Sequence, residues 1–130
     1  MVTRFKVSVL KLVLKHKRDL DPTLICDVMT ALIAQVKVVH SKGFIYKNLH
    51  PTAIGFMNPD AQSIMLCDFE FSQSYIDSMG QHIPDTITNM FVGSPGYASL
   101  RTHKGLSTSR KDDLESSFYL LWFMIYGNYP

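Results

Sequence analysis

Apolar side chains follow a regular pattern in the first third of the chain. They recur at three- and four-residue spacing: Ile25, Met29, Leu32, Val36 and Val39. This spacing is typical of one face of an α-helix. Asp21 suits the N-cap and Pro22 the first helical position, while Gly43 suits the C-terminal cap. The pattern therefore predicts one long helix over residues 22–41.

Short strand signals follow this helix. One lies at residues 44–45 and another at residues 54–57, and a third spans residues 63–67. The run Asn58-Pro59-Asp60 between the last two has the residue types of a tight turn. We therefore predict a β-hairpin whose second strand ends at Asp68.

The second half of the chain begins with a long stretch that lacks periodicity. Residues 69–108 predict a loop without regular structure, and loops of that length are often functional. Residues 112–126 predict a second long helix, which Gly127 ends. Because residues 118–126 are apolar or aromatic at every position, we expect this helix in the centre of a core. The fold class is mainly α with a small β-hairpin.

The N-terminal region has clustered apolar residues that could share one helical face: Phe5, Val9, Leu12 and Val13. Two interpretations follow: a helix that packs on its own domain, which we favour, or an amphipathic helix on a membrane surface. Lysines interrupt every candidate signal-peptide core: Lys6, Lys11 and Lys15. We judge no stretch long enough to span a bilayer and expect an intracellular protein, cytoplasmic or nuclear.

Composition adds limits to this picture. The 130 residues fit one domain, and 46% hydrophobic with 18% charged residues is typical of a globular chain. The net charge of +2 gives no indication of a nucleic-acid partner, and we expect none. Cys26 and Cys67 are far apart without a metal-ligand pair, which predicts buried free thiols in a reducing compartment.

Several ordered motifs along the chain resemble a known family. The runs VVHSKGF, YKNLHPTAIGF and LCDFEFSQSY follow the order of the C-terminal lobe of protein kinases. The later runs HIP, GSPGYASLRTHKG and SRKDDLES are similar to the casein kinase 1 family. The resemblance covers about residues 8–130 and implies a partial kinase domain over residues 1–130. It also implies that the upper lobe and the final helices are absent.

The resemblance implies three changes in the catalytic loop. Asn48 stands where kinases carry the catalytic aspartate, and an amide cannot accept a proton at neutral pH. Losing such a base typically costs a factor of ~10²–10⁴ in rate. His50 replaces the phosphate-steadying lysine, and Ala53 replaces a magnesium-binding asparagine. ATP and Mg²⁺ are thus implied by ancestry only, and we expect no cofactor in this chain.

At other positions of the family pattern, this chain either keeps the family residue or carries a different one. Asp68 matches the second magnesium ligand, although an inherited structural acid is the favoured interpretation, and Glu70 replaces the following glycine. A metal shared by His50 and Asp68 is the weaker alternative. Gly96 replaces the arginine of the substrate-anion site, so a preference for acidic substrates is not carried over.

The retained positions are mostly architectural. By the resemblance, Asp113 accepts hydrogen bonds from the catalytic-loop backbone. Tyr46 and Phe69 are expected in the core, and Tyr97 is kept from the family motif.

Three hypotheses remain open on this basis. The first is an inactive kinase-derived interaction module, the second is a piece of a longer active Ser/Thr kinase, and the third is an unstable product of a truncated or mispredicted gene. If the final helices are absent, we expect part of the second helix to be exposed as a partner surface: Trp122, Phe123 and Ile125.

Overall fold

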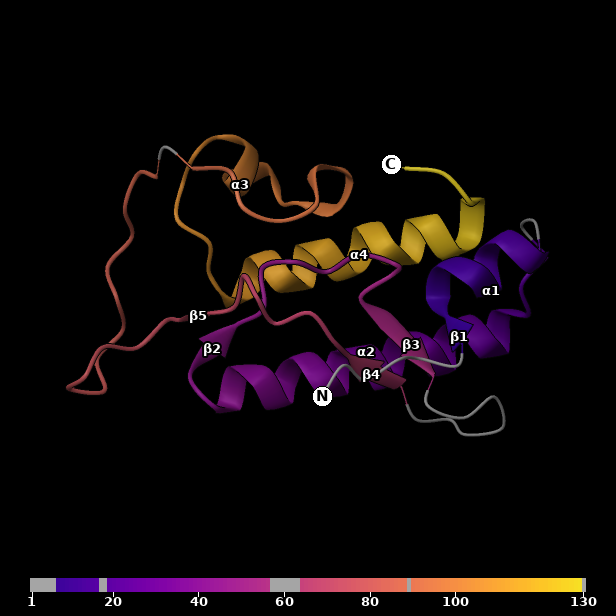
Figure 1. Ribbon diagram of the computed structural model, residues 1–130, viewed down its shortest axis with the longest axis horizontal. Coiled ribbons are helices and arrows are strands. Elements are labelled where there is room, and N and C mark those ends of the chain that lie inside the picture. Colours follow the sequence, from indigo (N-terminus) through magenta and orange to yellow (C-terminus); the bar gives the residue numbers. More distant parts are fainter. Residues whose placement is uncertain (1–6, 17–18, 57–63, 89, 130) are drawn as a thin grey trace.

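Two long antiparallel helices form the frame of the molecule. The computed structural model describes residues 7–16, 19–56, 64–88 and 90–129 (Figure 1). Helix α2 (Pro22–Ser41) packs against α4 (Arg110–Tyr126), and two small antiparallel sheets lie beside them. The predicted class, mainly helical with a small hairpin, is confirmed at this level.

The bounds of α2 agree with the predicted helix over residues 22–41. The Asp21 carboxylate accepts a hydrogen bond from the Thr23 amide at 2.9 Å, and Pro22 occupies the first turn. The helix ends where Gly43 takes a positive φ of 84°, a conformation that glycine reaches without strain. Its buried face joins the core through Val28, Leu32 and Val36. Cys26 lies outside this face and is exposed, and Cys67 is half-buried, so the predicted burial of the two thiols was wrong.

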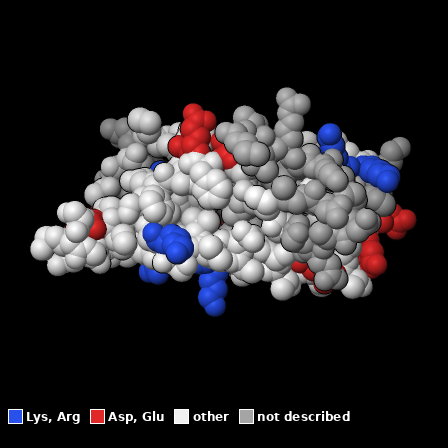
Figure 2. Space-filling view, turned by 60° about the horizontal axis from the view of Figure 1, so that its bottom comes forward, with Lys and Arg blue, Asp and Glu red and all other residues white. Residues whose placement is uncertain are grey.

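Helix α2 also meets the length and composition of a membrane span. The helix has 20 residues and a mean hydropathy of 1.5. The expectation that no stretch is long enough to span a bilayer was therefore wrong. The reason is that Asp27 and Lys37 are its only acidic or basic residues apart from His40. Core helices of globular proteins pass the same test, so this is weak evidence for a span. Figure 2 views the molecule with the α2 side turned forward. Few Lys, Arg, Asp or Glu side chains are visible in the described part of that face.

The predicted hairpin is present. Strands β3 (Ile54–Phe56) and β4 (Ile64–Leu66) pair antiparallel, with Ile54 opposite Leu66. Strand β1 (Val7–Ser8) extends this sheet on the other side of β3. The turn predicted at residues 58–60 lies outside the described residues.

The region from residue 69 to 108 holds more regular structure than the sequence predicts. Strand β5 (Gln73–Ser74) pairs with β2 (Phe44–Ile45). A 3₁₀ turn, η1 (Pro95–Tyr97), and the single-turn helix α3 (Leu100–His103) follow. The prediction of an unstructured loop was wrong because elements of two to four residues are too short to produce a periodic pattern.

The N-terminal helix packs on its own domain, in agreement with the interpretation that the sequence analysis favoured. Helix α1 (Val9–His16) buries Val9 and Val13 in the same core as α2, and Leu12 packs at the edge of that core. Phe5 lies outside the described residues. The side chains of this face are therefore occupied within the molecule.

Helix α4 is covered on one side only, contrary to the prediction of a helix at the centre of a core. Leu120, Phe123 and Met124 are buried, whereas Trp122 and Ile125 are 43% and 41% exposed. The expected exposure of Phe123 was wrong because its ring packs edge-on against Tyr97, with centroids 6.0 Å apart. Among the described residues, α2 and η1 contact α4 and leave its other face uncovered.

Candidate functional site

The loop between β2 and β3 is anchored by one buried carboxylate. Asp113, on the first turn of α4, is 1% exposed and accepts hydrogen bonds from the Tyr46 and Lys47 amides, both at 2.8 Å. His40 Nε2 approaches the same carboxylate at 2.8 Å. These bonds hold Lys47 at a φ of 69°, which is unusual for a residue with a side chain. The carboxylate thereby fixes the path of the loop.

Tyr46 forms the floor of the site. It is fully buried, and its hydroxyl donates to the Cys67 carbonyl. Burial raises the pKa of Tyr46 strongly, so the phenol stays protonated and remains a donor. Phe69 meets the Tyr46 ring edge-on with centroids 5.1 Å apart. Phe69 is nevertheless 49% exposed, so its placement in the core was wrong: the edge-on contact with Tyr46 leaves about half of the side chain open to solvent.

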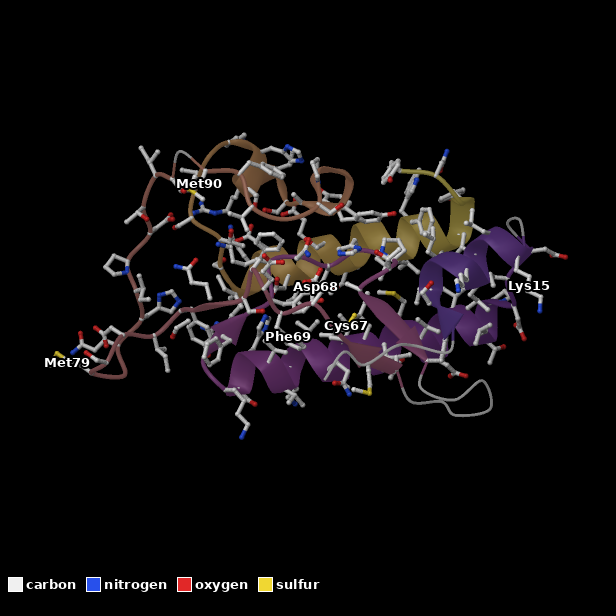
Figure 3. All side chains as sticks on the ribbon, viewed as in Figure 1. Lys15, Cys67, Asp68, Phe69, Met79 and Met90 are labelled. Atoms are coloured by element: carbon white, nitrogen blue, oxygen red, sulfur yellow. The ribbon has the colours of Figure 1, made fainter. Side chains whose placement is uncertain are left out.

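Asn48 and Asp68 meet at the end of β4. Asn48 is 5% exposed, and its Nδ2 donates to Asp68 Oδ2 over a long 3.5 Å. Asp68 has a φ of 61°, the left-handed conformation that aspartate adopts more readily than most residues. Figure 3 shows Cys67, Asp68 and Phe69 between the two long helices in this view, and Met79 far away at the tip of the following loop. The pair offers one carboxylate and one neutral amide.

His50 turns to a neighbour in its own loop rather than to Asp68. Its Nδ1 lies 2.7 Å from Thr52 Oγ1, and no hydrogen bond or ion pair joins it to Asp68. Burial lowers the pKa of His50, and the negative charge of Asp68 opposes that effect in part. A neutral imidazole is therefore favoured at pH 7, which makes His50 a weak substitute for a phosphate-binding cation.

Ala53 contributes backbone and no side-chain ligand. It is 1% exposed, and its carbonyl accepts a hydrogen bond from the Cys67 amide at 2.9 Å, just before Asp68. The backbone of Ala53 is therefore paired with the residue that precedes Asp68. Within residues 7–16, 19–56, 64–88 and 90–129, no three His, Cys, Asp or Glu side chains gather as a metal site.

The turn at η1 does not join the pair. A Cβ on Gly96 would overlap the ring of Tyr129, so the room left by the missing side chain is filled by an aromatic residue from beyond α4. Tyr97 is buried beside that ring, with centroids 5.4 Å apart, and burial raises its pKa strongly. Glu70 lies exposed in the turn after Phe69.

Two polar contacts of this region were missed by the sequence analysis. Lys47 Nζ donates to Gln73 Oε1 at 2.9 Å, and Arg101 binds Asp85. These partners are 26 and 16 residues apart. No local pattern signals such pairs, because side chains so far apart in the sequence meet only through the tertiary fold.

Comparison with known proteins supplies the remaining evidence. No protein-family model matches the chain. A probable casein kinase I homologue from Encephalitozoon cuniculi (strain GB-M1) is 32% identical over 125 residues, which are 96% of this chain and 39% of that protein. The chain therefore spans about two fifths of the length of this relative. The match confirms the resemblance that the sequence motifs indicated.

Proposed function

We propose that this chain, which is related to the casein kinase I family, is a catalytically inactive derivative of a kinase C-terminal lobe that acts as a protein-binding module. The match over 96% of the chain supports the ancestry. The mainly helical architecture with its antiparallel hairpin is compatible with that lobe. The same relation favours a protein that works inside the cell. The proposal of inactivity depends on the loop chemistry.

The observation that carries the proposal is the Asn48–Asp68 pair. Two carboxylates at this separation would repel each other and would favour a bound divalent cation. The Asn48 amide instead donates to Asp68 at 3.5 Å, so the pair is compatible without a cation. The same amide cannot take a proton from a substrate hydroxyl. An asparagine at position 48 thus removes the base, and it also removes the negative charge that would attract a metal ion to Asp68.

The neighbouring residues support the same conclusion. Ala53 has no oxygen to add to Asp68, and His50 is bonded to Thr52 with a lowered pKa. Phosphoryl transfer depends on metal ions and cations that neutralise the transferred phosphate. Asp68 alone supplies one ligand group, whereas Mg²⁺ is usually held by one or two carboxylates together with the substrate phosphates. We therefore assign neither ATP nor Mg²⁺ to this chain.

A second candidate function is a segment of a longer Ser/Thr kinase. The length of the relative favours it, because the matched region is only 39% of that protein. Even in a longer protein, Asn48 would stand in place of the base. The third hypothesis, an unstable product, predicts a chain without a cooperative unfolding transition.

Rebuilding the metal site tests the proposal. We expect the purified chain to transfer no phosphate from ATP to an acidic protein substrate and to bind no Mn²⁺ by electron paramagnetic resonance. The double variant Asn48→Asp/Ala53→Asn should gain Mn²⁺ binding, because it places a carboxylate and an amide oxygen beside Asp68. Adding Asp68→Asn to this variant should abolish the gain. Phosphate transfer by the parent chain that Asp68→Ala abolishes would overturn the proposal.

A further inference from the structure

A short strap is held across the surface by one ion pair and a hydroxyl. The strap comprises residues 85–88. Arg101 Nη2 donates to both carboxylate oxygens of Asp85, at 2.7 and 2.6 Å, and Ser107 Oγ donates to Asp85 Oδ1 at 2.6 Å. We call Asp85, Arg101 and Ser107 the latch. Its three residues come from the strap, from α3 and from the loop after α3.

Polar contacts hold the strap, without much apolar burial. The Thr88 amide donates to the Gly105 carbonyl at 2.7 Å, and the Ser107 amide donates to the Thr86 carbonyl at 2.8 Å. Ile87, the large apolar residue of the strap, is 81% exposed. The Thr86 amide also donates to Ser107 Oγ at 3.0 Å. The strap therefore gains little from the hydrophobic effect, and its closure depends on the latch, on the two backbone bonds and on this third contact.

A cavity of about 410 Å³ lies under this strap. Part of its wall comes from the strap residues Asp85, Thr86 and Thr88. The cavity is also lined by Lys47, from the loop between β2 and β3, and by Lys111, from α4. Among the described residues that line the cavity, Asp85 is the only acidic one. If the strap leaves, the cavity opens and its remaining charged side chains are cationic.

The latch does not satisfy the guanidinium of Arg101. A single nitrogen, Nη2, donates to both oxygens of Asp85, whereas Nε is shielded from solvent and has no hydrogen-bond partner in the part of the chain that the structure describes. Arginine binds carboxylate or phosphate best through two parallel N–H groups. A buried donor without an acceptor is costly, and an exposed ion pair such as this one, with Asp85 62% exposed, contributes little. Neither feature of the ion pair therefore stabilises the closed strap strongly.

We propose that Arg101 is an anion site whose built-in ligand is Asp85. An external oxyanion with two acceptor oxygens, a phosphate or a carboxylate, engages Nε and Nη2 side by side and displaces Asp85. The strap is then released and the cavity opens. This inference is independent of the proposed function, because it involves neither the Asn48–Asp68 pair nor Gly96.

Inorganic phosphate is the probe for this site. Hydrogen exchange of the whole chain is followed by mass spectrometry, in phosphate and in chloride at equal ionic strength. Phosphate should raise the exchange rate in peptides that cover residues 84–88 and 105–108 by about two- to fivefold, the range expected for losing an exposed ion pair. Peptides from α2 and α4 should not change.

Two variants separate a built-in ligand from a merely structural contact. Asp85→Asn should raise exchange of the strap without phosphate and should bind phosphate more tightly by calorimetry, because the internal competitor is weakened. Arg101→Lys keeps the positive charge but lacks the paired N–H groups, so the phosphate response should disappear. An equal phosphate response in Arg101→Lys, or unchanged phosphate affinity in Asp85→Asn, would overturn the inference.

Discussion

At the residue scale, one buried carboxylate and one buried amide have opposite consequences for the site. Asp113 accepts two backbone amides of the loop and thereby preserves its shape. Asn48, which under the proposed function stands in the position of the base, is a neutral group that donates to Asp68. The shape and the chemistry of this loop thus depend on different side chains, so the proposed loss of the base is compatible with a preserved loop shape.

The loop chemistry predicts a pH dependence of stability through His50. Burial lowers the pKa of His50 in the folded chain, while the unfolded value is about 6.5. The unfolded chain therefore binds more protons below that value. The contribution of His50 is fully present above the unfolded pKa and is lost as the pH falls below it toward the folded pKa. His50→Gln should reduce the loss of stability between pH 7.5 and 5.

Urea denaturation at both pH values, monitored by circular dichroism, measures this effect. The matched control is His82→Gln, because His82 is exposed and its ring nitrogen bonds the carbonyl of the neighbouring Ile83. We expect the control to keep the pH dependence of the parent chain. If His50→Gln and the parent lose equal stability on acidification, a depressed His50 pKa is not the cause.

At the element scale, one hydrogen bond joins the starts of two helices. Ser99 caps α3 by accepting the Thr102 amide at 3.2 Å, and its hydroxyl donates to Asp112 Oδ1 at 2.7 Å. Asp112 also accepts the Ser109 amide at 2.7 Å, which caps α4. Because Ser99 and Asp112 are nearly fully buried, neither can turn to water for a substitute partner.

Removing this hydroxyl should weaken both helix starts together. We expect Ser99→Ala to lower the free energy of unfolding by about 1–3 kcal/mol, through the lost cap and an unsatisfied carboxylate oxygen. Urea denaturation provides the measurement. The control is Ser41→Ala in the exposed last turn of α2, which should change stability by no more than about 0.5 kcal/mol. Equal effects of the two substitutions would contradict the proposed link.

The elements differ in how far the sequence could predict them. The bounds of α2 followed from periodicity with Asp21, Pro22 and Gly43 at its ends, because these signals are local. The elements η1 and α3 span three and four residues and give no periodic signal. The exposure of Phe69 and the pairing of Arg101 with Asp85 depend on which segments pack together, so neither could be predicted from local sequence.

At the scale of the whole molecule, apolar side chains remain uncovered along the two long helices. A groove of about 410 Å³ lies between α2 and α4, lined by Met29, Ile33, Phe118 and Leu121 among others. Phe118 is 69% exposed at its rim. Exposed apolar surface that extends over neighbouring elements is a common sign of an interaction surface or of a tendency to aggregate.

The groove predicts self-association of the isolated chain that one substitution relieves. Phe118→Gln should reduce the binding of an apolar fluorescent dye and the apparent mass by light scattering, because it removes a large ring from the rim. Stability should change by no more than about 0.5 kcal/mol, since the ring is largely solvated already. Leu100→Gln is the control, because Leu100 is 63% exposed on α3, outside the residues that line the groove. An equal decrease in both variants would show that general hydrophobicity, rather than the groove between α2 and α4, causes the association.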